Sequence, residues 1–101
     1  MRSLLVAVMF VAALLSACSD ASEDKYGADL FGTTCSHCHG SDLGGGIGPP
    51  LGQGSGAASL TDEQIVGVVT VGPGAMPAFG GRLTDEQIAS LVDYLREEQG
   101  S

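Results

Sequence analysis

The stretch Cys35-Ser36-His37-Cys38-His39 places two thiols three residues apart and a histidine directly after the second thiol. Three interpretations of this spacing are weak. A thioredoxin-like redox pair needs a strand before it and a βαβ context, and the sequence has neither. A zinc site needs four converging ligands, and the chain offers no second cluster of Cys or His. A plain structural disulfide gives no role to His39.

The same stretch matches Cys-x-x-Cys-His, the attachment signature of a c-type haem. The spacing has a mechanical reason, because the thiols of Cys35 and Cys38 can add across the two vinyl groups of one porphyrin and His39 then lies under the iron. One covalently attached haem would also supply the core that a small, Gly-rich chain lacks. Its neighbours pin the backbone of His37, so we expect that side chain to point away from the iron.

A second axial ligand must come from elsewhere in the chain, and Met76 is the only methionine beyond residue 9. Two prolines and a glycine bracket it in a stiff, non-helical loop that can present a thioether to a metal. Its alternative role is to fill a gap in the core. Because histidine with methionine is an established axial pair of haem iron, we predict that His39 and Met76 are the two iron ligands.

The same six-residue sequence occurs twice and each time predicts the start of a helix. Leu-Thr-Asp-Glu-Gln-Ile occurs at 60–65 and again at 83–88, each time with Thr three residues before Gln, which is a capping box. An apolar stripe follows each start at helical spacing. The first stripe is Ile65, Val68 and Val69, and the second is Ile88, Leu91, Val92 and Leu95. We therefore predict one helix after each hexapeptide.

A shorter helix is predicted ahead of the cysteines, where apolar and small residues recur at helical spacing. These residues are Tyr26, Gly27, Leu30 and Phe31. From residue 40 to residue 56, eight glycines and a pair of adjacent prolines exclude regular structure, which predicts a loop that wraps another group. No segment has the pattern of a strand, so we expect an all-α fold.

The N-terminal segment is typical of an export signal. An uncharged apolar run from Leu4 to Leu15 follows Arg2, and it is too short for a membrane-spanning helix of about 20 residues. Residues 15–18, Leu-Ser-Ala-Cys, resemble the bacterial lipobox. This resemblance implies cleavage before Cys18 and acylation of its thiol, which would anchor the chain in a lipid bilayer. The alternative is a secreted protein with a spare thiol.

Length and charge limit the possible partners. We predict a lipoprotein signal peptide at 1–17, a lipidated tether at 18–25 and one domain at 26–101, since 101 residues suit a single core. Twelve acidic and four basic side chains give a net charge of −8, which excludes a nucleic-acid partner. The same charge would be repelled by anionic lipid, so the acyl chains and not electrostatics must hold the chain at the membrane.

From Tyr26 to Gln99 the chain resembles the small class I cytochromes c of the short bacterial monohaem type. The resemblance implies a cytochrome c-like fold, in which three to four short helices wrap around one covalently bound haem. It also implies that Cys35 and Cys38 carry the haem, that His39 is the proximal ligand and that Met76 is the distal one.

Two further features follow from this resemblance. Residues 48–51, Gly-Pro-Pro-Leu, are similar to a family stretch whose proline carbonyl accepts the imidazole N–H, which would assign that role to Pro49. The alternative is a simple turn. Gly27, Phe31 and Tyr94 match the family's crossing of terminal helices, where a small residue lets the backbones approach, although Tyr94 could equally be a half-exposed surface ring.

Electron transfer is the function that the resemblance implies. Iron held between a neutral imidazole and a neutral thioether has no open position, so we expect an electron carrier and not an enzyme. We expect a monomer that serves membrane-bound redox proteins on the periplasmic side of a bacterial membrane. One alternative is a haem enzyme or gas sensor from which Met76 is displaced. Another is a cytochrome subunit of an oxidase or dehydrogenase complex.

Overall fold

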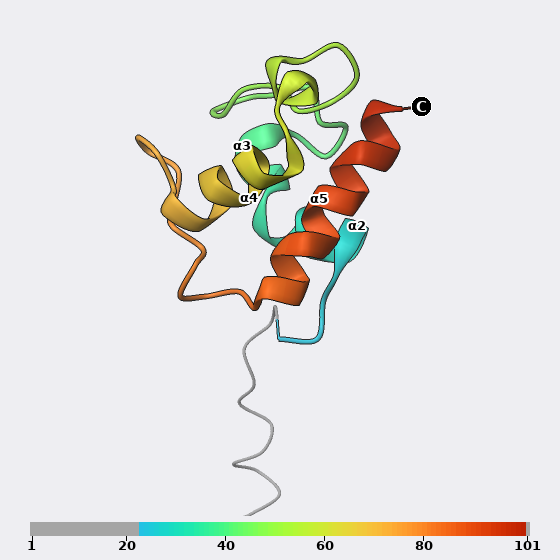
Figure 1. Cartoon of the computed structure of the whole chain (residues 1–101). Helices are drawn as coiled ribbons and strands as arrows, with labels where there is room; N and C mark the ends of the chain where they lie inside the picture. Colours follow the sequence, from blue (N-terminus) through green and yellow to red (C-terminus); the bar gives the residue numbers. More distant parts are fainter. Residues whose placement is uncertain (1–22, 101) are drawn as a thin grey trace, which may run out of the picture.

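A computed structural model describes residues 23–100, so the predicted signal peptide and Cys18 lie outside the described residues. In the described part the chain forms four α-helices and one 3-10 helix, with no strand, which confirms the all-α prediction (Figure 1). The elements are α2 (Gly27–Thr34), α3 (Ser36–His39), η1 (Gly56–Ser59), α4 (Asp62–Val71) and α5 (Asp85–Gln99). Between residues 23 and 100, none of these helices has the length and apolarity needed to cross a bilayer.

Both predicted capping boxes are formed at the starts of α4 and α5. The Gln64 amide donates to Thr61 Oγ1 over 3.1 Å, and the Thr61 amide donates back to Gln64 Oε1 over 2.9 Å. Thr84 and Gln87 repeat this exchange at 3.0 and 3.1 Å. Each box satisfies amides that a helix start leaves without partners, and this explains why the two helices begin directly after the threonines.

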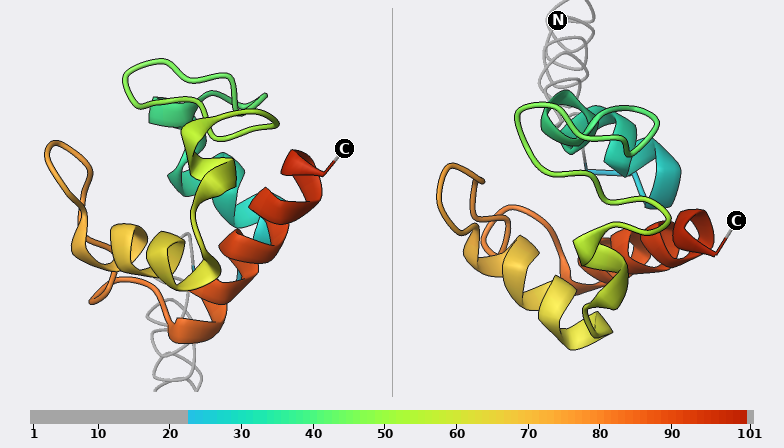
Figure 2. Two further views of the ribbon diagram at one scale, coloured as in Figure 1. Left: turned by 45° about the horizontal axis from the view of Figure 1, so that its top comes forward. Right: turned by 90° about the horizontal axis from the view of Figure 1, so that it is seen from above.

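The core lies where α5 packs against both α2 and α4 (Figure 2). Its buried apolar side chains are Leu30, Phe31, Leu43, Ile65, Val69, Phe79, Leu83, Ile88, Leu91, Val92 and Leu95. The stripe predicted for α5 is buried in full. The stripe predicted for α4 is wrong in one position, because Val68 is 37% exposed. Ile65 and Val69 are four residues apart on one face of α4, and this narrow face is enough for packing.

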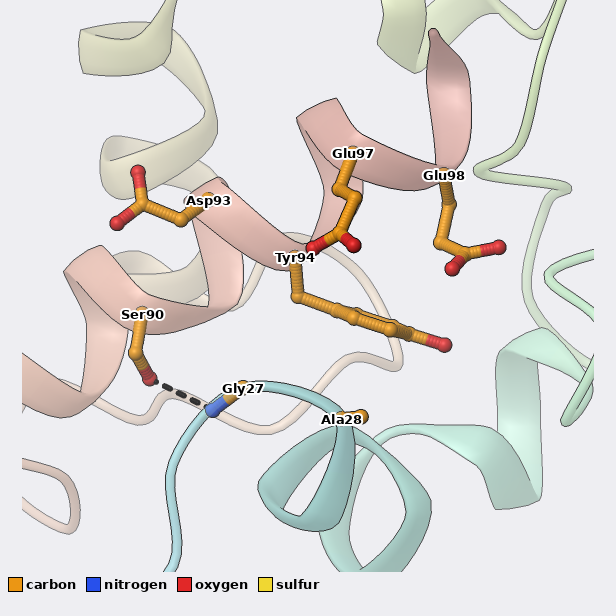
Figure 3. A pocket seen from close by; sticks show the side chains of 7 residues that line it. All are labelled: Gly27, Ala28, Ser90, Asp93, Tyr94, Glu97 and Glu98. Atoms are coloured by element: carbon orange, nitrogen blue, oxygen red, sulfur yellow. Dashed lines mark hydrogen bonds between the residues drawn. The ribbon is translucent and has the colours of Figure 1, made fainter. Parts of the chain in front are cut away.

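The terminal helices cross at an aromatic contact, as the resemblance implies. The rings of Phe31 and Tyr94 lie with their centroids 5.3 Å apart and their planes at 45°. The Gly27 amide donates to Ser90 Oγ over 2.9 Å, at the edge of an open groove of about 330 Å³ (Figure 3). Gly27 was expected to allow close approach, but a Cβ there would meet nothing within 4 Å. Its φ of +53° is the reason that glycine suits this position.

The Gly-rich segment after α3 is a loop without regular structure up to residue 55, as predicted. Leu43 fixes it to the core with 3% of its surface exposed, and the partly buried Leu51 packs against the same core. The carbonyl of Leu43 accepts hydrogen bonds from the amides of Leu51 (2.9 Å) and Gly52 (3.3 Å). Leu43 has a φ of +62°, which is unfavourable for a residue with a Cβ. Burial of its side chain and these hydrogen bonds offset that strain.

Candidate haem site

One short helical segment carries Cys35, Cys38 and His39. Cys35 lies between α2 and α3, and its carbonyl accepts hydrogen bonds from the amides of Cys38 (3.2 Å) and His39 (3.1 Å). His39 is buried, whereas both cysteines are partly buried and neither is bridged. The side chain of His37 is exposed. The segment therefore presents two thiols and one imidazole in the order that thioether attachment to a porphyrin requires.

A backbone carbonyl orients the buried imidazole. His39 Nδ1 lies 2.8 Å from the carbonyl oxygen of Pro49, ten residues further along the chain. A carbonyl oxygen can only accept, so Nδ1 carries the proton and donates it to Pro49. In this tautomer Nε2 keeps its lone pair, which is the form in which a histidine binds a metal. The donor set thus fits a haem iron on the Nε2 side of the ring.

Glycine at position 48 makes room for that ring. A Cβ on Gly48 would lie 2.9 Å from His39 Cε1, which is closer than real Cβ atoms approach, and 3.1 Å from Nδ1, which is tighter than most real contacts. The Gly48 amide donates to the carbonyl of Cys38 over 2.8 Å, and the Gly45 amide donates to the carbonyl of His39 over the same distance. The loop is therefore fastened to the attachment motif on both sides of the imidazole. Sequence reasoning did not assign this role to Gly48, although the glycine directly before the proline pair was the available signal.

Met76 lies in a closed loop that follows α4. This loop projects away from α5 (Figure 2). Two hydrogen bonds close the loop, from the Phe79 amide to the Val69 carbonyl (3.0 Å) and from the Gly80 amide to the Thr70 carbonyl (3.2 Å). These bonds also satisfy carbonyls that the end of α4 leaves free. The side chain of Met76 is partly buried and packs against the hydrophobic core.

Gly72 shapes the start of this loop. It caps α4 in the left-handed conformation, with φ of +66° and ψ of +69°. A Cβ at this position would lie 2.5 Å from backbone atoms of Pro77 and Ala78. Only glycine fits such a position, because a side chain would suffer both the conformational penalty and the overlap. Sequence reasoning noted the residues beside Met76 but not this more distant requirement.

The surroundings of the Cys35 thiol are unlike those of a redox-active cysteine. Burial, and to a lesser extent the neighbouring Cys38, raise the pKa of the Cys35 thiol from 9.0 to about 11. A reactive Cys-x-x-Cys motif needs the opposite shift, since the thiolate is the nucleophile. In the part of the chain that the structure describes, no three His, Cys, Asp or Glu side chains gather as a metal-binding group.

Known proteins that are similar to this chain are c-type cytochromes or their subunits. Residues 22–95 match the family model described as "Cytochrome C oxidase, cbb3-type, subunit III". The chain is 41% identical over 83 residues to cytochrome c6 of Leptolyngbya boryana, covering 71% of this chain and 88% of that protein. It is 40% identical over 60 residues to the menaquinol:cytochrome c reductase cytochrome c subunit of Geobacillus thermodenitrificans, covering 59% of this chain and 22% of that protein.

A solved structure supports the same assignment at the level of the fold. The c-type cytochrome NirC superposes with a TM-score of 0.61 at 33% sequence identity, covering 69% of this chain and 84% of that one. The cofactor that follows is one covalently bound c-type haem, for which Cys35 and Cys38 fit the attachment motif. The chain therefore belongs to the cytochrome c family, as a small monohaem member of class I.

Proposed function

We propose that this c-type cytochrome carries single electrons between membrane-bound redox partners, with His39 and Met76 as the axial ligands of its haem. The observation that carries the proposal is the 2.8 Å contact between His39 Nδ1 and the Pro49 carbonyl. This contact places the imidazole proton on Nδ1 and leaves the lone pair of Nε2 for the iron. The position of Met76 in a closed, proline-flanked loop supports the second ligand. Pro49 then acts on the metal indirectly, through the imidazole.

Bound haem supplies an iron that changes between the ferric and ferrous states. The residues of this chain determine how easily it does so. Donation from Nδ1 to Pro49 makes the His39 imidazole a stronger electron donor, whereas the soft thioether of Met76 stabilises the ferrous state. Both ligands are neutral, so the ligand set need not change with oxidation state. The chain holds the porphyrin by two thioethers, which keeps the cofactor in place through repeated electron transfers.

Replacing Met76 with alanine tests the ligand assignment. We expect the oxidised wild-type protein to show the weak long-wavelength absorption of a ferric iron–methionine sulfur bond, and we expect Met76→Ala to lose it. The ferrous variant should then bind carbon monoxide within the mixing time, while the wild type resists it. A wild-type protein that lacks the absorption and binds carbon monoxide as readily would contradict His/Met ligation and favour a haem enzyme or gas sensor.

Lipid attachment at Cys18 is the proposed means of localisation, on the outer side of a bacterial membrane. Its support comes from the sequence, in the apolar run and the Leu-Ser-Ala-Cys motif at 15–18. Tethering to the membrane of its partners would raise their local concentration and allow weak, short-lived contacts. The excess of carboxylates favours partners with basic docking surfaces.

The anchor can be tested by fractionation of cells that produce the full-length chain. A variant in which residues 1–18 are replaced by an ordinary cleavable secretory signal is expected to move most of the haem protein from the membrane to the soluble fraction, because its mature chain has neither acyl chains nor the apolar run at 4–15. Ser19→Ala, a neighbouring substitution that retains the thiol, should leave it in the membrane. Equal membrane retention of both variants would refute the lipid anchor.

A second candidate function is that of a cytochrome subunit in a larger oxidase or reductase complex. The description of the matching family model names an oxidase subunit. One relative is a reductase subunit, and the match covers 22% of its length. The electron-transfer chemistry is the same in both candidates, and only the partner differs. Solubilisation in mild detergent separates them, since a free carrier elutes near its own mass and a subunit elutes with the complex.

A further inference from the structure

The last turn of α5 holds both ends of the segment 51–60, which directly follows the two prolines. Gln99 Nε2 donates to the Leu51 carbonyl over 2.9 Å. Arg96 Nη2 donates to the Leu60 carbonyl at the other end, and Arg96 Nη1 donates to Gln99 Oε1 over 2.7 Å. We call Arg96 and Gln99 the clasp. The clasp joins residues 48 and 36 positions apart in the sequence, so it closes a long loop from a rigid helix.

One end of the clasp lies next to the carbonyl that orients His39. Leu51 is two residues after Pro49, and its amide donates to the Leu43 carbonyl over 2.9 Å. Leu51 is therefore held from both sides, by the core residue Leu43 and by Gln99. Pro50 is the one residue between them, and Pro49 and Pro50 both have a nearly fixed φ, so few torsions are left to absorb a displacement of Leu51 before it reaches the Pro49 carbonyl.

The ion pair of Arg96 does not account for the clasp. Arg96 Nε lies 2.9 Å from Asp62 Oδ1, but the two side chains are 30% and 65% exposed. Exposed pairs of this kind contribute about 0–1 kcal/mol. The contacts to backbone carbonyls are more specific, because each fixes a loop position that no regular secondary structure supports. Arg96 also orients the Gln99 amide so that its nitrogen faces Leu51.

We infer that Gln99, oriented by Arg96, is a positioning residue for the axial histidine. It keeps the Pro49 carbonyl within hydrogen-bond distance of His39 Nδ1 and so controls how strongly the imidazole donates to the iron. The inference rests on the proposed ligation by His39. It extends the haem site to the C-terminal turn of α5, although no residue of that turn belongs to the attachment motif.

The test follows the His39 Nδ1 proton by NMR in the reduced haem protein. Gln99→Leu is expected to accelerate its exchange with solvent about tenfold, as for the loss of one net hydrogen bond. Amide protons of the α5 core, such as that of Leu91, should exchange at wild-type rates, which separates local loosening from global destabilisation. The reduction potential should rise, because an imidazole with a weaker hydrogen bond donates less to ferric iron.

Two further variants make the result decisive. Gln53→Leu is the matched control, because it makes the same substitution at an exposed glutamine of the clasped segment, and it should change neither quantity. Gln99→Glu keeps an acceptor for Arg96 but cannot donate to Leu51, so it should fold and still accelerate proton exchange. The inference would be overturned if the His39 Nδ1 proton exchanged at the wild-type rate in both Gln99 variants. It would also be overturned if Gln53→Leu accelerated that exchange as much as Gln99→Leu does. A wild-type protein without a haem-shifted Nδ1 resonance would instead overturn ligation by His39.

Discussion

Replacing both Cys35 and Cys38 with alanine is expected to remove the haem and most of the free energy of unfolding. The apolar core is small, and the segments 40–55 and 72–83 have no regular secondary structure to support them. A domain of this size normally needs a staple, and the cofactor is the staple available here. We expect a loss of at least about 5 kcal/mol, which is the whole stability of many small domains.

The measurement is haem absorbance of the purified chain after denaturation, followed by thermal unfolding monitored by circular dichroism. His37→Ala is the matched control within the same motif, because its side chain is exposed, and it should retain both haem and stability. Single replacement of either cysteine leaves one thioether and should give an intermediate loss. A double variant that unfolds cooperatively near the wild-type temperature would show that the polypeptide folds without its cofactor.

Gly72→Ala is expected to have the second largest effect. The new Cβ would overlap backbone atoms of Pro77 and Ala78 at 2.5 Å, on the loop that carries Met76. A left-handed residue with a Cβ costs roughly 1–2 kcal/mol, and overpacking adds roughly 1–3 kcal/mol. We therefore expect a total destabilisation of roughly 2–5 kcal/mol, together with loss of the iron–methionine absorption.

Gly74→Ala is a control that separates these two costs. Gly74 has a nearly equal φ of +61°, but a Cβ there would meet nothing within 4 Å. It should therefore show only the conformational penalty, with the iron–methionine absorption retained. Chemical denaturation of both variants measures the difference between them. If the two variants lose equal stability and both keep the absorption, then contact between Gly72 and the returning loop does not position Met76.

The predictions that succeeded from sequence rest on signals within a few residues. Thr61 and Thr84 each lie three positions before a glutamine, and both capping boxes form as written. The apolar stripe of α5 is buried because its spacing alone places those residues on one face. The attachment motif is equally local. A pattern confined to one turn of helix needs no knowledge of its tertiary neighbours.

The features that sequence reasoning missed depend on contacts between distant segments. Leu43 enters the core from a glycine-rich loop, with a backbone conformation that its residue type does not favour. The requirement for glycine at position 72 arises only when Pro77 returns beside it. The hydrogen bond from Gln99 to Leu51 spans 48 residues, and no sequence pattern near either residue predicts it. Such contacts are set by the packing of the whole chain, and a single sequence does not encode them locally.

The crossing of α2 and α5 imposes an order on biosynthesis. The Phe31–Tyr94 contact joins the first and last helices of the described domain, so the core stays incomplete until the final segment has emerged. Synthesis runs from the N-terminus to the C-terminus, so Cys-x-x-Cys-His emerges before the helix that completes this core. The fifteen residues of α5 are therefore the last of the described helices to be made, and the packing of α2 and of α4 waits for them.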